Sequence, residues 1–177
     1  MPEKLKLEAL CRKSIEEFKT SEKMPVVVLL DNVRSMYNVG SVFRTSDAFS
    51  PEKIYLCGIT PRPPHREIQK TALGATESVE WEYAESITEL VNLLKKEGYS
   101  IVGIEQVKGS VSLQEYKISE DKKYALILGN EVEGISEEIL SLVDVFVEIP
   151  QSGTKHSLNV STCAGIVLWE WYRVFQK

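Results

Sequence analysis

Six short apolar runs recur along the chain, separated by polar segments and turn residues. They cover residues 25–31, 53–58, 79–84, 99–105, 124–130 and 145–150, and several are rich in β-branched side chains. Short runs that are apolar almost throughout are typical of strands buried on both faces of a sheet. We therefore predict six strands.

The segments between these runs carry a helical period. "SITELVNLLKKEG" opens at Ser86 with Glu89 three residues later, the pattern of a capping box, and it closes at Gly98, which suits a left-handed C-cap. "ISEEILSLV" opens at Ser136 as a cap, with acids in its first turn, where the helix dipole favours them. Strands alternating with helices predict an α/β fold, a mostly parallel six-stranded sheet with helices on both faces.

The last helical segment, "SLNVSTCAGIVLWEWYRVF", is apolar on more than one side. Such a helix must be covered nearly all round, either inside one subunit or by a second copy of the chain. The first 24 residues are charged, with Leu7, Cys11, Ile15 and Phe18 at helical spacing. We predict a helical extension over residues 1–24 and one domain over residues 25–177.

The composition fits a single globular domain, with 177 residues of which 43% are hydrophobic and 27% charged. No apolar run approaches the roughly 20 residues of a membrane span, and "MPEKLKLEALCRKS" lacks the apolar stretch of a secretory signal. These features predict a cytoplasmic protein that does not enter a membrane. Cys11, Cys57 and Cys163 are scattered, which indicates buried thiols rather than a disulfide framework or a metal site.

The net charge of −5 argues against a general nucleic-acid coat, although a local cationic surface is compatible with it. The densest cationic stretch is "RPPHREIQK", which contains Arg62, His65, Arg66 and Lys70. This stretch fits a solvated surface loop and a binding surface equally well.

Three polar segments follow predicted strands: "DNVRSMYNVGSVFR", "GNEVEG" and "PQSGTKHSLN". In open parallel sheets, ligands bind at the carboxyl ends of strands, where helices begin and backbone amides are unpaired. The chain contains no G-x-G-x-x-G, no G-x-x-x-x-G-K-[ST] and no G-x-S-x-G, and His65 and His156 are isolated. The sequence therefore argues against a hydrolase or dehydrogenase of the common kinds.

The three segments suit a polar organic ligand without phosphates. Their glycines allow close backbone approach, and their polar side chains supply donors and acceptors; these residues are Gly129, Gly134, Gly153, Asn38, Asn130, Asn159, Ser157 and Glu131. Each also has a purely structural explanation. Glu131 and Glu133 suit the start of the next helix, Ser157 or Asn159 suits the cap of the last helix, and Gly40 would let a helix pack tightly.

Taken together, three ordered motifs resemble one known family. They are "NVGSVFRTSDAF" at 38–49, "LILGNEVEGIS" at 126–136 and "IPQSGTKHSLNVSTCAG" at 149–165. These segments are similar in kind and order to the motifs of the SpoU (TrmH-like) group of the SPOUT superfamily, the RNA ribose 2′-O-methyltransferases. The resemblance covers about residues 25–175, so residues 25–177 are expected to form a SPOUT methyltransferase domain.

This resemblance implies S-adenosylmethionine as methyl donor, a trefoil knot in the C-terminal half, an RNA substrate, a homodimer and no metal. The catalytic positions of the family fall on Asn38, Arg44, Glu131, Ser157 and Asn159. The donor is expected at Leu128, Gly129, Ile149 and Leu158, with Gly134, Gly153, Glu105 and Gln106 as further candidates. RNA contacts are expected from Arg34, Arg62, Arg66, Lys70 and Lys155, with the first 24 residues and Arg173 in support.

Arg44 is expected at the mouth of the pocket, beside the donor. Family proposals make this arginine a general base for the ribose 2′-hydroxyl, but a guanidinium has a pKa above about 12 and is effectively always charged. We favour a different role, in which Arg44 grips the adjacent phosphate with its planar fork and stabilises the developing alkoxide.

The RNA substrate is less strongly specified by the sequence. Gln151 stands where methionine often follows Ile-Pro in these enzymes, and "GIEQ", "EIPQSG" and "SLNVSTCAGIVLWEWYR" look closer to tRNA methyltransferases that modify a D-loop guanosine. This resemblance favours tRNA over rRNA. Two alternatives stay open, a catalytically silent RNA-binding module of the same fold and a small-molecule methyltransferase.

Overall fold

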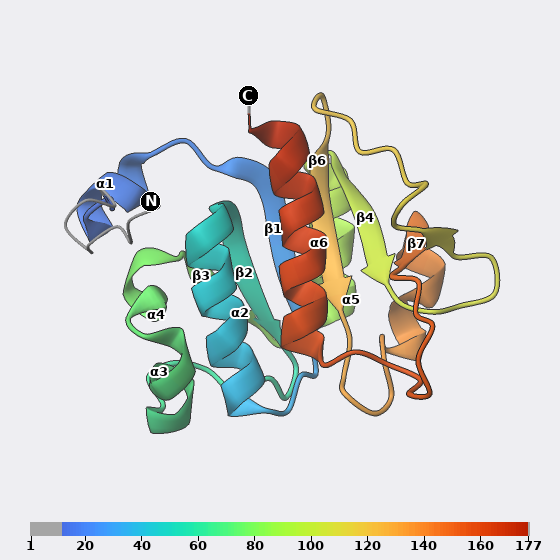
Figure 1. Ribbon diagram of the computed structural model, residues 1–177, viewed down its shortest axis with the longest axis horizontal. Helices are drawn as coiled ribbons and strands as arrows, with labels where there is room; N and C mark the ends of the chain where they lie inside the picture. The colour runs from blue at the N-terminus through green and yellow to red at the C-terminus, as the bar shows by residue number, and fades with distance from the viewer. Residues whose placement is uncertain (1–11, 177) are drawn as a thin grey trace, which may run out of the picture.

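A single parallel sheet of seven strands organises the structure, a computed structural model that describes residues 12–176 (Figure 1). The strands are β1 (Met24–Asp31), β2 (Pro51–Cys57), β3 (Trp81–Ala84), β4 (Tyr99–Ile104), β5 (Val111–Ser112), β6 (Lys123–Leu128) and β7 (Val145–Glu148). Their order across the sheet is β3-β2-β1-β6-β4-β7-β5, and every pair is parallel. All carboxyl ends therefore lie at one edge of the sheet.

Helices cover both faces of this sheet, as predicted. They are α1 (Ile15–Thr20), α2 (Met36–Phe49), α3 (Arg66–Ala72), α4 (Ala75–Ser78), α5 (Ile87–Lys96), the 3₁₀ helix η2 (Glu137–Leu142) and α6 (Val160–Phe175). Alternate residues of β1 point to opposite faces: Val28 packs in the core that α2 and α6 cover, and Leu29 packs in the core that α5 and η2 cover. Within the described residues, no helix combines the length and apolar character of a membrane span.

The prediction of six strands is wrong by one. All six predicted runs form strands, but β5 adds a seventh that pairs with β7 through Val111 and Ser112. Two residues are too few to show any periodicity, so the pattern of the sequence could not reveal them.

One helix prediction is wrong at its start, and another has the cap that was expected. Ser136 makes no side-chain cap bond to the segment that follows it, which forms a 3₁₀ helix. Its hydroxyl oxygen instead accepts from Asn32 Nδ2 at 3.1 Å, and its hydroxyl donates to Asp31 at 2.9 Å. Ser86 does cap α5, accepting from the Glu89 N–H, and Gly98 has a positive φ of 86° at the C-terminal end. The predicted N-terminal extension is seen as the short helix α1, which contains Ile15 and Phe18 and begins after its N-cap Ser14. The helical spacing predicted through Cys11 to Ile15 is wrong, because residues 12–14 are not helical; residues 1–11 lie outside the described part of the chain.

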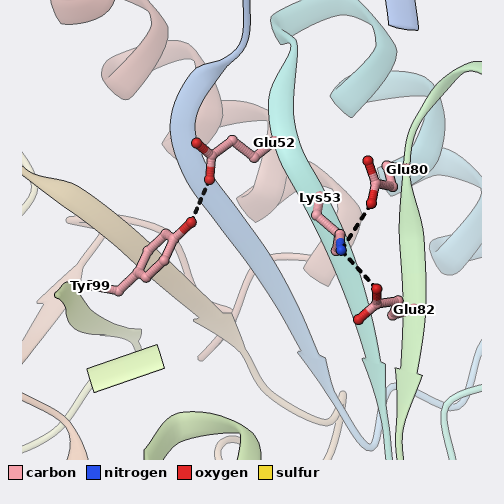
Figure 2. Close-up of polar contacts among 5 residues, drawn as sticks. All are labelled: Glu52, Lys53, Glu80, Glu82 and Tyr99. Atoms are coloured by element: carbon pink, nitrogen blue, oxygen red, sulfur yellow. Dashed lines mark hydrogen bonds and ion pairs between the residues drawn. The ribbon is translucent and has the colours of Figure 1, made fainter. Parts of the chain in front are cut away.

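Two groups of polar contacts join the amino ends of β2, β3 and β4, at the edge of the sheet opposite the predicted site (Figure 2). The Tyr99 hydroxyl donates to Glu52 at 2.5 Å, and Lys53 Nζ lies 2.9 Å from Glu80 and 2.8 Å from Glu82. Burial and the bond to Glu52 both raise the pKa of Tyr99, so the phenol stays protonated and donates. Tyr99 thereby links β4 to β2 across the strands between them.

Candidate active site

A pocket of about 420 Å³ lies at the carboxyl edge of the sheet, where the chain leaves β4, β6 and β7. This volume is within the range of about 300–1,000 Å³ usual for cofactor sites. Apolar and polar side chains from the strand ends, from the loops that follow them and from the start of α6 line it together. The predicted residues that line it are Glu105, Gln106, Leu128, Gly129, Glu131, Gly134, Ile149, Ser157, Leu158 and Asn159. Segments far apart in the sequence thus converge as the motifs predicted.

Glu131 connects the loop after β6 to the start of α2. Its carboxylate accepts from the N–H groups of Arg34 (3.0 Å) and Ser35 (3.1 Å) and from Asn38 Nδ2 (2.9 Å). Partial burial opposes ionisation, but the bonds from Arg34, Asn38 and Ser35 outweigh it and lower the pKa of Glu131. A carboxylate held in this way is a weak base, so its visible role is to position the loop.

Asn38 links Glu131 to the start of α6. Its Oδ1 accepts from Asn159 Nδ2 at 3.0 Å, and Asn159 Oδ1 in turn accepts from the N–H of Ser161 at 2.9 Å. Asn159 is therefore the N-cap of α6, one of the two structural explanations that its position allowed. We call Glu131, Asn38 and Asn159 the amide relay. It joins all three motif segments, although Asn38 does not itself line the pocket.

Glycines let the loop after β6 fold back on itself. A Cβ at Gly129 would lie 2.2 Å from the carbonyl carbon of Gly134, and one at Gly134 would lie 2.3 Å from Glu105 Oε2. Asn130 and Gly134 exchange two backbone hydrogen bonds, of 2.8 and 3.0 Å. Gly134 also has a φ of 73°, which favours glycine. Both glycines are thus needed for the wall of the pocket.

Asp31 and Asn32 hold the far side of this loop, and the sequence analysis missed them. Fully buried Asp31 accepts from the Ser136 N–H at 2.7 Å and from its hydroxyl at 2.9 Å. Asn130 Nδ2 donates to the Asn32 carbonyl at 2.7 Å. Burial is the largest influence on the pKa of Asp31 and raises it, against the bonds from Ser136. An acidic residue that ends an otherwise apolar strand is the signal that could have identified this position.

The pocket carries acidic groups and one thiol. Glu105, Glu131 and Glu148 line it together with Cys163. Burial, and then the neighbouring Glu105, raise the pKa of Cys163 to about 12, so its sulfur remains a protonated thiol. Within residues 12–176, no group of His, Cys, Asp or Glu side chains could hold a metal ion.

Arg44 and Gly153 do not line the pocket of this chain. Arg44 is exposed on α2, six residues after Asn38 and so about 9 Å further along the helix axis. Its side chain makes no hydrogen bond or ion pair within the described residues. Gly153 lies in the exposed loop between β7 and α6. A catalytic role for Arg44 thus stays a prediction. It requires that bound RNA or a second copy of the chain bring Arg44 to the reacting group.

The predicted RNA-binding residues lie near the same edge of the sheet, and all are exposed. Arg34 precedes α2, Arg66 begins α3, and Lys155 lies in the loop before α6. Arg62 stacks on Tyr83, with Cζ 4.2 Å from the ring centroid, and Lys70 Nζ lies 5.9 Å from the centroid of Tyr37.

The sequence profile described as the SpoU rRNA Methylase family matches residues 25–169. The chain belongs to this family. An uncharacterized tRNA/rRNA methyltransferase of Borreliella burgdorferi is 34% identical to it over 156 residues, which cover 88% of this chain and 67% of that protein. The tRNA (guanosine(18)-2′-O)-methyltransferase of Aquifex aeolicus is 32% identical over 167 residues, 91% of this chain and 75% of that one.

Solved structures of the SpoU family show the same fold. The AdoMet-bound rRNA methyltransferase from Sinorhizobium meliloti superposes with a TM-score of 0.79 at 28% identity, covering 86% of this chain. The chain spans 57% of the length of that protein.

Proposed function

We propose that this chain is an S-adenosylmethionine-dependent methyltransferase that modifies a ribose 2′-hydroxyl of RNA, with tRNA ahead of rRNA. The observation that carries this proposal is the pocket itself. Its walls are the segments that contain the second and third SpoU motifs, and the amide relay ties the first motif to both. Relatives named as tRNA and rRNA methyltransferases, and the AdoMet-bound structure of one of them, support it.

The residues of the pocket fit this donor. Leu128, Ile149 and Leu158 supply an apolar surface for a flat heterocycle, while backbone groups around Gly129 can bind its edge. The acidic rim, which includes Glu105, complements a cationic sulfonium and an ammonium group. When bound, S-adenosylmethionine supplies an electrophilic methyl group.

The described residues also bear on how the ribose is held. Ser157 is an exposed hydroxyl in the wall of the pocket and can hydrogen-bond a substrate oxygen. The amide relay fixes the segment in which Ser157 lies, because Asn159 is anchored to Asn38. The planar guanidinium of Arg44 can grip a phosphate or stabilise an alkoxide once it is brought to the reacting group.

A trefoil knot and a homodimer remain part of the proposal, on the strength of the family resemblance. Support for the dimer comes from α6, where Trp169 is 47% exposed and Ile166 is 36% exposed. Large apolar side chains exposed on one helix face are typical of a subunit contact. Light scattering should give twice the mass of the chain, and Trp169→Glu should reduce it to a monomer.

The function is tested by transfer of labelled methyl groups from S-adenosylmethionine to separate pools of tRNA and rRNA. We expect label in tRNA that survives as a 2′-O-methyl nucleoside after complete digestion. Label in rRNA alone would reverse the substrate preference. Donor binding without transfer to either pool would contradict the proposal and favour a small-molecule methyltransferase, and no donor binding would favour the silent module.

The role of Arg44 is tested in the same assay at several pH values, with Arg44→Lys and Arg44→Ala. A phosphate fork predicts that lysine restores little of the lost activity and that the pH profile keeps its shape. Full activity of Arg44→Lys would contradict the fork.

A further inference from the structure

Two exposed tyrosines, one on α2 and one on the edge strand β3, each lie against a cationic side chain. Tyr37, in the first turn of α2, is 45% exposed, and Lys70 Nζ lies 5.9 Å from its ring centroid. Tyr83, near the end of β3, is 40% exposed, and Arg62 Cζ lies 4.2 Å from its ring centroid. We call these four residues the tyrosine–cation surface.

Tyr37 is held in place by close contact between α2 and α3. Its carbonyl accepts from Thr71 Oγ1 at 3.0 Å, and a Cβ at Gly40 would lie 2.3 Å from the Ile68 carbonyl oxygen. The backbones of the two helices therefore touch, which fixes the position of Tyr37 relative to Lys70. An aromatic ring on a rigid support binds a partner with little loss of conformational entropy.

Tyr37 is the member of the tyrosine–cation surface that lies nearest to the pocket along the chain. Tyr37 directly precedes Asn38, whose Nδ2 lies 2.9 Å from Glu131 in the pocket wall. Figure 1 shows the start of α2, helix α3 and the loops after β6 and β7 at the same edge of the sheet. A ligand that enters the pocket and extends beyond it toward α3 meets Tyr37 first.

The chemistry of this surface fits unpaired nucleotides. Every base offers a flat face that stacks on an aromatic ring, and neighbouring cations contact the phosphates. Double-stranded RNA keeps its bases inside the helix and is bound mainly through phosphates and 2′-hydroxyls, so it offers no base face that could stack on an exposed ring. Helix α3 carries Arg66 and Lys70 against one acid, Glu67, so the cations are not cancelled locally despite the net negative charge of the chain.

We propose that Tyr37 with Lys70 and Tyr83 with Arg62 bind unpaired RNA nucleotides that flank the target nucleotide. This rests on the proposed function and specifies its substrate: the methylated position lies in a single-stranded loop or end, whose neighbouring bases stack on the two tyrosines.

The test measures binding of a fluorescein-labelled single-stranded RNA of about ten nucleotides, within the usual size of such sites, by anisotropy. A blunt duplex of the same length is the second probe. Tyr37→Ala and Tyr83→Ala should each weaken single-strand binding by about tenfold, and Tyr37→Phe should keep the affinity of the wild type because the ring remains. Duplex binding should change by less than about twofold in all three, since duplexes offer no base face.

A charge variant tests the other half of the surface. Lys70→Gln should lower the salt dependence of single-strand binding by about one phosphate contact. Lys96→Gln is the matched control, since Lys96 is an exposed lysine on α5, the helix that covers the opposite face of the sheet. It should leave both affinity and salt dependence unchanged.

Three results would overturn this inference: no measurable binding of single-stranded RNA by the wild type, a loss of less than about twofold in both tyrosine-to-alanine variants, or an equal loss for the duplex. Titration of S-adenosylmethionine into the wild type and each variant tells whether a negative result contradicts the stacking surface or the proposed function. Wild type that binds and transfers the donor methyl group, with both alanine variants unimpaired on RNA, would contradict only the stacking surface. Wild type that binds single-stranded RNA through the two tyrosines but does not bind the donor would contradict the proposed function alone.

Discussion

Replacing Glu131 with glutamine should weaken the amide relay while keeping its shape. The carboxylate accepts three hydrogen bonds, from the N–H groups of Arg34 and Ser35 and from the side chain of Asn38. A glutamine oxygen in the Oε1 position can keep the bonds from Ser35 and Asn38. Its NH₂ group would then face the Arg34 N–H, donor against donor.

The size of the effect follows from these three bonds. Hydrogen bonds to charged groups contribute about 1.5–3 kcal/mol and neutral ones about 0.5–1.5 kcal/mol. The glutamine loses the bond from Arg34, and its bonds from Ser35 and Asn38 become bonds to a neutral acceptor. Because Glu131 is exposed, solvent screens much of the energy difference between the charged and the neutral bonds. We therefore expect a loss of about 1–2 kcal/mol in unfolding free energy. For a chain of this size, the midpoint temperature should fall by about 2–8 °C.

The pH dependence of this loss has a definite sign. The pKa of Glu131 is lowered in the folded protein relative to its ordinary value of 4.5. Its contribution to stability is therefore complete above the unfolded pKa and disappears as pH falls through the folded pKa. Thermal unfolding followed by circular dichroism should show wild type above Glu131→Gln at pH 7, with the gap closing below about pH 4.5. Equal midpoints at pH 7, or a gap that does not narrow as the pH falls below about 4.5, would refute this reasoning.

Three further substitutions or reactions separate the pocket from the rest of the fold. Gly129→Ala places a Cβ 2.2 Å from the facing backbone, so the affinity for S-adenosylmethionine, measured by titration, should fall by at least about tenfold. Gly165→Ala is the control: its Cβ comes no closer than 4.0 Å to another residue, so the affinity should not change. Tyr99→Phe removes the 2.5 Å bond to Glu52 and should cost about 1 kcal/mol in denaturant unfolding, with unchanged donor affinity. Cys163, with a pKa near 12, should resist iodoacetamide at pH 8 when native and react when unfolded, as peptide mass spectrometry would show; fast native alkylation would contradict this.

The centre of the sheet was largely predictable because β1 and β6 are buried on both faces. Residues such as those of β1 are apolar almost without interruption, and turn residues mark their ends. β5 escaped prediction because its two residues form a strand only through pairing with β7. The missing cap at Ser136 likewise reflects distant contacts, because its hydroxyl accepts from Asn32 and donates to Asp31.

The candidate site was predictable where sequence and topology agree. Parallel strands bring their carboxyl ends to one edge, so residues that follow β4, β6 and β7 had to meet there. The amide relay depends on side-chain geometry across more than 90 residues, between Asn38 and Glu131, which no local pattern encodes. Arg44 was expected at the mouth of the pocket, but within one chain it does not line the pocket.

A crystal structure of this chain with S-adenosylmethionine tests the central claim most directly. We predict density for the donor between Leu128, Ile149 and Leu158, with its sulfonium on the side of the pocket that faces the amide relay. Density outside this pocket, or an empty pocket at saturating donor, would contradict the account.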